Sequence, residues 1–424
     1  MYTKFYFMRA LLCVALLIGA GELSAQSKVQ LSSEQAVQLA LENQPLLLAA
    51  QAVVAQAEGR LLQAGRLSNP ELGLSYQGDQ AFNDEGEQNF GLAFTQRFPV
   101  TNRLKLERAL AQKEIEVARA EIEEQMRELK LQVRLAVVTL ATTQAEWALR
   151  SQLTELNRNF LKFIESRVQA GEASTVEVDQ LQMALYVTEQ EAHHLEHQLI
   201  ADRAALNELM GMPADYEFEL STPLAMPTQA PRFPEFSQAR LEQHPSYRLR
   251  QLLLELAEGR IASARAERWA DVAVQIFYQE ERSMDAPEGL GRGRSFGLGI
   301  SVPLPLHDRN QGNIAASRAA RNEMQWRLQS IASKLQIEAK LQSELASELY
   351  HQAEKYETQL RAVLDRNAAA MQTAYTNGQI SLPELFQSQE QQLKIQSTQI
   401  EVLSELKKSK IRWSAATDVE LAGL

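Results

Sequence analysis

The sequence predicts a mainly α-helical fold with a small β part, built from two copies of one unit. Short motifs recur in the same order at an offset between 200 residues (Asn43 to Gln243) and 207 residues (Gly171 to Gly378). Two stretches of more than sixty residues contain neither glycine nor proline and carry apolar residues at helical spacing. Two shorter pairs of segments alternate apolar and polar residues, as strands with one apolar face do.

The beginning of the chain has the pattern of a secretory signal peptide. A basic start is followed by an apolar run over 11–20 and by Leu23-Ser24-Ala25, which offers a small-residue cleavage site. We therefore expect residues 1–25 to be removed on export. Cys13, the only cysteine, lies inside the apolar run. The mature chain would then have no thiol for lipidation, disulfides or metal binding. No later apolar run approaches the roughly 20 residues of a membrane helix.

The charge of the chain argues against nucleic acid as a partner. The formal net charge is −11, and removing residues 1–25, which carry two Lys or Arg and one Glu, leaves about −12. Binding to nucleic acid usually needs a basic face. The sequence also contains no Ser/His/Asp set, phosphate loop or carboxylate pair at catalytic spacing. It therefore predicts no enzyme and no cofactor.

The internal repeat predicts two units that follow the same order. The matched segments are Asn43-Gln44-Pro45 with Gln243-His244-Pro245, Gly59-Arg60 with Gly259-Arg260, Phe90–Thr95 with Phe296–Ser301, Pro99 with Pro305, and Gly171-x-x-Ser174-x-x-Glu177 with Gly378-x-x-Ser381-x-x-Glu384. Each unit is predicted to contain a helix, a β-hairpin, a long helix and a half-length helix. The predicted boundaries are 26–210 for the first unit, 211–236 for a Pro-rich linker, 237–416 for the second unit and 417–424 for a tail.

The two long helices are the most unusual prediction. The glycine- and proline-free stretches cover 103–170 and 313–377. At 1.5 Å per residue, each helix would be about 100 Å long, and an ordinary globular domain has no room for that. Flanking helices near 33–67 and 174–210 are about half as long, so two of them stacked end to end would match one long helix. Pro45, like its counterpart in the second copy, is expected to kink its helix.

The predicted strands have one apolar and one polar face. The apolar faces contain Leu72, Leu74 and Tyr76; Phe90, Leu92, Phe94 and Phe98; Val272, Val274, Ile276 and Tyr278; and Phe296, Leu298, Ile300 and Val302. We expect hairpin loops at 78–89 and 281–293. A soluble sheet is one interpretation. Four strands cannot close a membrane barrel, so membrane-spanning strands would have to be pooled by several chains. The long helices would then form a tube below the barrel.

These features together resemble the TolC family of outer-membrane efflux proteins. The resemblance rests on the signal peptide, the duplication, the Phe-Gly-Leu strands, the segments 302–306 and 308–312, and the two Gly-x-x-Ser-x-x-Glu turns. It covers nearly the whole mature chain and is greatest to CzcC-type heavy-metal efflux components. It implies a homotrimer in outer-membrane lipid, with a twelve-stranded barrel and a helical periplasmic tunnel. It also implies docking to a resistance-nodulation-division pump through a periplasmic adaptor. The exported substrate stays open, with divalent metal cations as one candidate.

The two Gly-x-x-Ser-x-x-Glu turns are the candidate functional site. Gly171 and Gly378 suit the left-handed position after a helix. The serine and glutamate of each turn suit a capping box at the next helix. The resemblance implies that these turns are the periplasmic tips, where the adaptor docks and the tunnel narrows. It places Arg167, Gly171, Ser174, Tyr375, Gly378 and Ser381 at the tips, and Glu177 and Glu384 at the pore constriction. The alternative is that both glutamates only cap helices.

A second candidate group consists of three histidines, His193, His194 and His197. His193 and His197 would share one helix face with spacing that suits a metal ion. No third ligand is fixed nearby, so a solvated helix face is the favoured interpretation, and no metal site is predicted.

Two other classes of protein remain as alternatives to an efflux channel. A periplasmic coiled-coil adaptor or scaffold would also contain long helical hairpins, but it would need a compact β-rich domain of its own. A diffusion porin would need many more strands in one chain.

Overall fold

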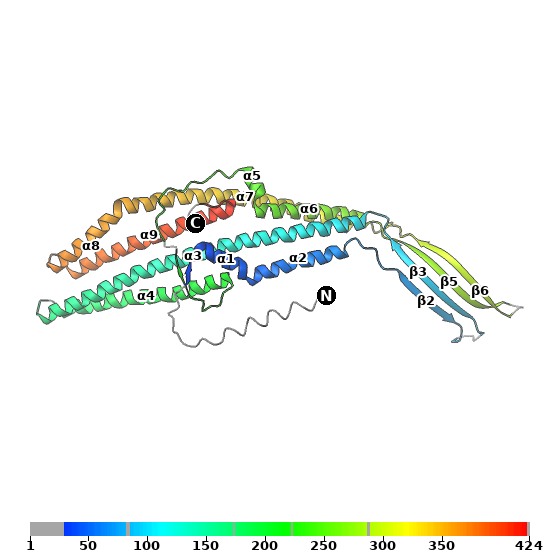
Figure 1. Ribbon diagram of the computed structural model, residues 1–424, viewed down its shortest axis with the longest axis horizontal. Helices are drawn as coiled ribbons and strands as arrows, with labels where there is room; N and C mark the ends of the chain where they lie inside the picture. The colour runs from blue at the N-terminus through cyan, green and yellow to red at the C-terminus, as the bar shows by residue number, and fades with distance from the viewer. Residues whose placement is uncertain (1–28, 82–84, 173, 222–223, 286–288, 422–424) are drawn as a thin grey trace, which may run out of the picture.

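The computed structural model describes residues 29–81, 85–172, 174–221, 224–285 and 289–421. The expected signal peptide at 1–25, with Cys13, lies outside the described residues. The molecule is elongated, with a sheet at one end and two helical hairpin turns at the other (Figure 1). Among the described residues, no helix combines the length and the apolar character needed to cross a bilayer.

The two copies contain the same elements in the same order. The first copy consists of α1 (Ser33–Asn43), α2 (Pro45–Gln63), β2 (Glu71–Gly78), β3 (Gln88–Phe98), α3 (Arg103–Gln169) and α4 (Thr175–Met210). The second consists of α5 (Gln238–Gln243), α6 (Pro245–Ala266), β5 (Val272–Asp285), β6 (Gly289–Ser301), α7 (Gln311–Lys355), η1 (Tyr356–Leu360), α8 (Arg361–Thr376) and α9 (Leu382–Thr417). The duplicated fold predicted from the repeats is therefore present.

The proline in each copy breaks its helix completely and starts the next one. Pro45 and Pro245 are the first residues of α2 and α6, where a missing N–H costs nothing. The residue before each proline reaches the end of a distant helix. The Gln44 side chain donates to the carbonyls of Glu208 and Leu209 at the end of α4. His244, in the same place of the second copy, has its Nε2 3.1 Å from the Ala415 carbonyl of α9. The repeated motif thus ties the same two helix ends in both units.

The first long helix is continuous, and the second is not. α3 contains 67 residues, which corresponds to about 100 Å. The expected single helix over 313–377 is instead divided by the π-helical turn η1. A π-turn adds one residue to the helical repeat and shifts the faces of the helix beyond it. Accordingly, few residues of α8 are buried within the protomer, and Figure 1 shows α8 bending relative to α7.

The four long strands form one antiparallel sheet in the order β2-β3-β5-β6. The register places the predicted apolar residues opposite one another in continuous rows. One row contains Leu72, Phe94, Ile276 and Leu298, and the next contains Leu74, Leu92, Tyr278 and Phe296. These rows therefore lie on one face of the sheet, whereas Phe277 lies on the opposite face, against Gly297. The predicted loop at 281–293 is wrong, because β5 and β6 continue their ladder to Asp285 and Gly289.

A short parallel strand pair was not predicted from the sequence. β1 (Val29–Leu31) pairs with β4 (Phe218–Leu220), which lies inside the predicted linker. Phe218 is 2 % exposed and packs in a core with Leu140 of α3 and Leu206 of α4. This pair fixes the linker against the middle of the helices.

Candidate functional site

The two hairpin turns far from the sheet have the same backbone geometry. Gly171 and Gly378 have φ values of 77° and 68°, in the left-handed region that glycine adopts without strain. Each turn contains the pair of hydrogen bonds of a Schellman motif. Glu172 N–H donates to the Arg167 carbonyl at 2.9 Å, and Gln379 N–H donates to the Ala374 carbonyl at 2.8 Å. The local sequence therefore explains how both helical hairpins turn.

The two predicted capping glutamates are used differently. Glu384 completes a capping box, because its carboxylate accepts the Ser381 N–H at 2.7 Å and the Ser381 hydroxyl at 2.8 Å. These bonds hold the pKa of Glu384 below its usual value. Ser174 caps α4 through Val176 N–H at 3.2 Å. Glu177, the counterpart of Glu384, makes no capping bond there among the described residues.

Glu177 instead joins the two hairpins of the chain. The Tyr375 hydroxyl, from α8, donates to the Glu177 carboxylate of α4 at 2.7 Å. Tyr375 is only 5 % exposed, and its ring meets Phe160 of α3 edge-on at 5.2 Å. Burial and the Glu177 carboxylate both raise the pKa of the Tyr375 hydroxyl, so this hydroxyl stays protonated and donates the bond. We call the Tyr375–Glu177 bond the clasp.

Apolar residues support the clasp from both hairpins. A shared cluster of buried side chains contains Phe160, Ile164, Leu181, Tyr375, Leu382 and Leu385. Arg167 lies beside it, with its guanidinium 6.0 Å from the Phe163 ring centroid and 3.5 Å from the Glu172 carboxylate. The structure therefore brings Arg167, Tyr375 and Glu177 together. It leaves Gly171, Ser174, Gly378 and Ser381 at the exposed ends of the turns.

Glu384→Gln should make the protein less sensitive to acid without changing the fold of the tip. A carboxyl whose folded pKa is lowered stabilises the fold above its unfolded pKa of about 4.5, and this contribution is lost as the pH falls through the folded pKa. Gln keeps the capping geometry but does not titrate. The difference in melting temperature between wild type and variant should therefore shrink below pH 4.5. A difference that is constant across this range would contradict the capping role.

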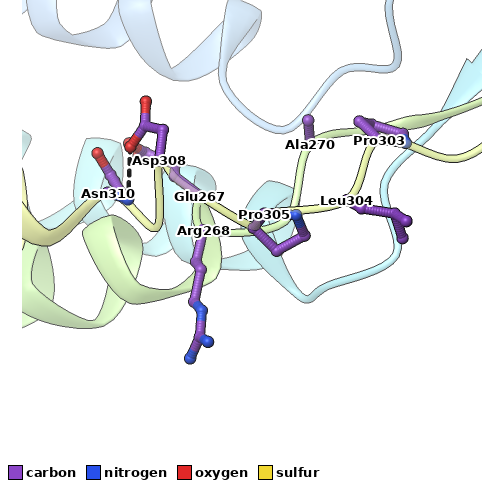
Figure 2. Close-up of a pocket in the computed structure, with 8 residues that line it drawn as sticks. All are labelled: Glu267, Arg268, Ala270, Pro303, Leu304, Pro305, Asp308 and Asn310. Carbon is purple, nitrogen blue, oxygen red and sulfur yellow. Dashed lines mark hydrogen bonds between the residues drawn. The ribbon is translucent and has the colours of Figure 1, made fainter.

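Charged and polar contacts fix the sheet to the helices at the other end of the tube. Arg103 at the start of α3 binds the Asp271 carboxylate through two bonds of 3.0 and 2.9 Å, just before β5. The Asn310 side chain donates to the Ala264 carbonyl of α6 at 2.8 Å, and Asn310 N–H donates to Asp308 at 2.8 Å. Figure 2 shows this region, where Pro303, Leu304 and Pro305 pass over the end of α6. The Asp308–Gly312 segment is thus a structural joint.

The three histidines do not form a metal site in the described part of the chain. No group of three metal-binding side chains occurs among the described residues. His193 Nδ1 lies 3.0 Å from Glu196, whose carboxylate also accepts the Trp147 indole N–H at 3.3 Å. His193 therefore belongs to a polar contact on the α3–α4 surface.

Comparisons with known proteins agree with this architecture. A family model described as "Outer membrane efflux protein" matches residues 36–212. The cobalt-zinc-cadmium resistance protein CzcC of Cupriavidus metallidurans is 26 % identical over 290 residues, which is 67 % of this chain and 65 % of that protein. The match thus spans just under two thirds of the length of this curated relative.

Two solved outer-membrane proteins are similar along most of their length. The outer membrane protein VceC of Vibrio cholerae is 17 % identical, with a TM-score of 0.69 over 91 % of this chain and 95 % of that one. The CmeC outer membrane channel of Campylobacter jejuni is 12 % identical, with a TM-score of 0.73 over 91 % and 85 %. None of these matches is an enzyme. The chain thus shares the fold of these solved outer-membrane proteins, and its residues 36–212 match the outer membrane efflux protein family model.

Proposed function

We propose that the protein is the outer-membrane channel of a tripartite efflux system. The observation that carries this proposal is a four-stranded sheet with one continuous apolar face and two free edges, β2 and β6. In lipid, a free edge would leave backbone groups without hydrogen bonds. β6 of one chain therefore pairs with β2 of the next, and three chains close a barrel of twelve strands. The helices continue this barrel as a tunnel through the periplasm.

The partners follow from this architecture and from the family. A channel without its own energy source conducts substrate passively from an inner-membrane pump. We propose a pump of the resistance-nodulation-division class and a periplasmic adaptor that contacts the exposed ends of the two hairpin turns. Arg167, Gly171, Ser174, Gly378 and Ser381 are the proposed contact residues. Likeness to a cobalt-zinc-cadmium resistance protein supports divalent metal cations as substrate.

The clasp supports a gate at the same end of the tunnel. Widening the tunnel there requires the hairpin α3–α4 to move away from α8–α9, and this movement breaks the bond between Tyr375 and Glu177. Three chains would also gather three copies of each tip glutamate around one axis. Such a concentration of carboxylates attracts cations and repels anions. We therefore assign Tyr375 to the gate and propose that Glu177 and Glu384 line the constriction.

The protein should be a trimer in mild detergent. Light scattering of the protein extracted from outer membranes should give about three times the mass of one chain, and boiling should convert this species to the monomer on gels. Four strands cannot close a barrel, so several chains must pool their strands, and the resemblance to the efflux family supplies the number three. A monomer that stays soluble without detergent would favour the adaptor or scaffold alternative and contradict the channel.

A further inference from the structure

The apolar face of the sheet is interrupted by a row of positive charges, beyond which Met284 lies opposite Leu290. Beyond the row that contains Tyr278 and Phe296, the same face continues with Glu280 opposite Arg294. The next row on this face places Arg282 directly opposite Arg292. Side chains directly opposite in an antiparallel pair have Cβ atoms about 5 Å apart, and like charges at that distance repel. The fold therefore holds two guanidinium groups together at the far end of the barrel.

Among the residues that the structure describes, Arg282 and Arg292 have no ion-pair partner. Arg294 is balanced by Glu280, whose carboxylate lies 3.7 Å from its Nε. Neither Arg282 nor Arg292 forms an ion pair or side-chain hydrogen bond with any described residue. Within the described part of the sheet, both groups are thus available to an anion from outside the chain.

Two tyrosines locate this row at the surface of a membrane. Tyr278, at the end of the apolar rows, donates its hydroxyl to Glu280 at 3.3 Å. Tyr76 on β2 turns its hydroxyl toward Gly78, where an added Cβ would lie 3.3 Å from the oxygen. Tyrosine is enriched at the boundary between hydrocarbon and headgroups, with its ring in the apolar layer and its hydroxyl in the polar one. Arg282 and Arg292 therefore lie at headgroup level on the lipid-facing side.

We propose that Arg282 and Arg292 bind a phosphate of the phosphorylated glycolipid, lipid A, in the outer leaflet. This inference rests on the proposed outer-membrane location, which directs the β5–β6 hairpin away from the periplasm. A planar guanidinium donates two parallel hydrogen bonds to a phosphate, and two facing guanidiniums clamp one phosphate from both strands. The acyl chains of the same lipid then cover the apolar rows that contain Phe296 and Leu298. One lipid thus satisfies both the charge and the exposed apolar surface.

The test measures how strongly the intact trimer binds lipid A in detergent. It compares phosphorylated lipid A with lipid A from which the phosphates have been removed. Wild-type trimer should retain the phosphorylated form through native mass spectrometry more strongly than the dephosphorylated form. Arg282→Gln and Arg292→Gln should each weaken binding of the phosphorylated form by about tenfold, as expected for charged hydrogen bonds. Arg282→Lys, which keeps the charge but not the planar fork, should recover part of the affinity.

Arg97→Gln is the matched control, because it removes the same charge from the opposite face of the same sheet. Arg97 pairs with Glu71 at 3.2 Å and should not affect binding. Unchanged affinity in the double variant Arg282→Gln/Arg292→Gln would overturn the site, as would equal binding of phosphatidylglycerol by the wild type. Light scattering on the same samples separates this outcome from failure of the channel itself. Trimers without lipid A selectivity refute only the site, whereas absence of trimers refutes the channel and the site together.

Discussion

Leu298→Arg should abolish the trimer in the outer membrane. Leu298 lies in a central row of the apolar face, opposite Ile276, and is 66 % exposed in the single chain. An arginine near the middle of the bilayer costs about 2–4 kcal/mol on the lipid face of a barrel. Three chains carry the change, so the assembled barrel would lose about 6–12 kcal/mol, which is comparable to the whole stability of a typical domain. Heat-modifiable trimer in outer-membrane fractions should fall below detection.

Ser301→Arg provides the control for this substitution. Ser301 lies on the same strand but on the opposite face, across from Ala273. In the barrel this face lines the lumen, where water solvates a charge, so trimer should persist at near wild-type levels. Equal loss of trimer in both variants would mean that neither face of the sheet meets lipid. If the trimer is preserved in both variants, this result would also mean that neither face of the sheet meets lipid.

The faces of the strands were predictable because apolar and polar residues alternate within each strand, independently of the strands that pair with it. Leu72 and Leu298 are far apart in the chain, yet each was assigned to the correct face from its own strand, and pairing then aligned them in one row. The lengths of β5 and β6 were not predictable. Glycines at 289, 291 and 293 resemble a loop in the sequence. The ladder between the two strands holds them extended, and this is a tertiary effect that overrides local preference.

Three further features depend on distant partners and gave little signal. β1 has three residues, too few for a period, and it becomes a strand only because β4 lies beside it. The π-turn η1 contains neither glycine nor proline, so the sequence predicted one unbroken helix. The pairing of Gln44 and His244 with the ends of α4 and α9 is also non-local. In that case, however, the repeat had marked both residues as equivalent.

The tip was predictable in its turns but not in its clasp. Glycine, serine and glutamate at fixed spacing specify the end of one helix and the start of the next, because caps form within a few residues. The same rule predicted identical roles for Glu177 and Glu384. The structure gives them different bonds, because Glu177 faces Tyr375 from a position 198 residues away. No pattern within either repeat contains that contact.

Tyr375→Phe should open the tunnel without unfolding the protein. The substitution removes only the hydroxyl that donates to Glu177 and keeps the ring in its contact with Phe160. A hydrogen bond to a charged group stabilises by about 1.5–3 kcal/mol, so loss of the clasp in each chain should shift the hairpins toward separation by about tenfold or more. Single-channel conductance in planar bilayers should rise, while the melting temperature of the trimer changes little.

Tyr350→Phe is the control, because this tyrosine is equally buried in the same helical unit. Tyr350 is 8 % exposed, and its hydroxyl has no hydrogen-bond partner among the described residues. Its substitution removes the same atom without breaking a contact between hairpins, so conductance should stay at the wild-type value. A gate also predicts that adding Glu177→Gln to Tyr375→Phe does not raise the conductance further, because the bond is already lost. The added substitution should, however, weaken cation selectivity, because it removes a negative charge. Conductance that is unchanged in Tyr375→Phe, measured beside an unchanged melting curve, would show that the clasp only packs the tip.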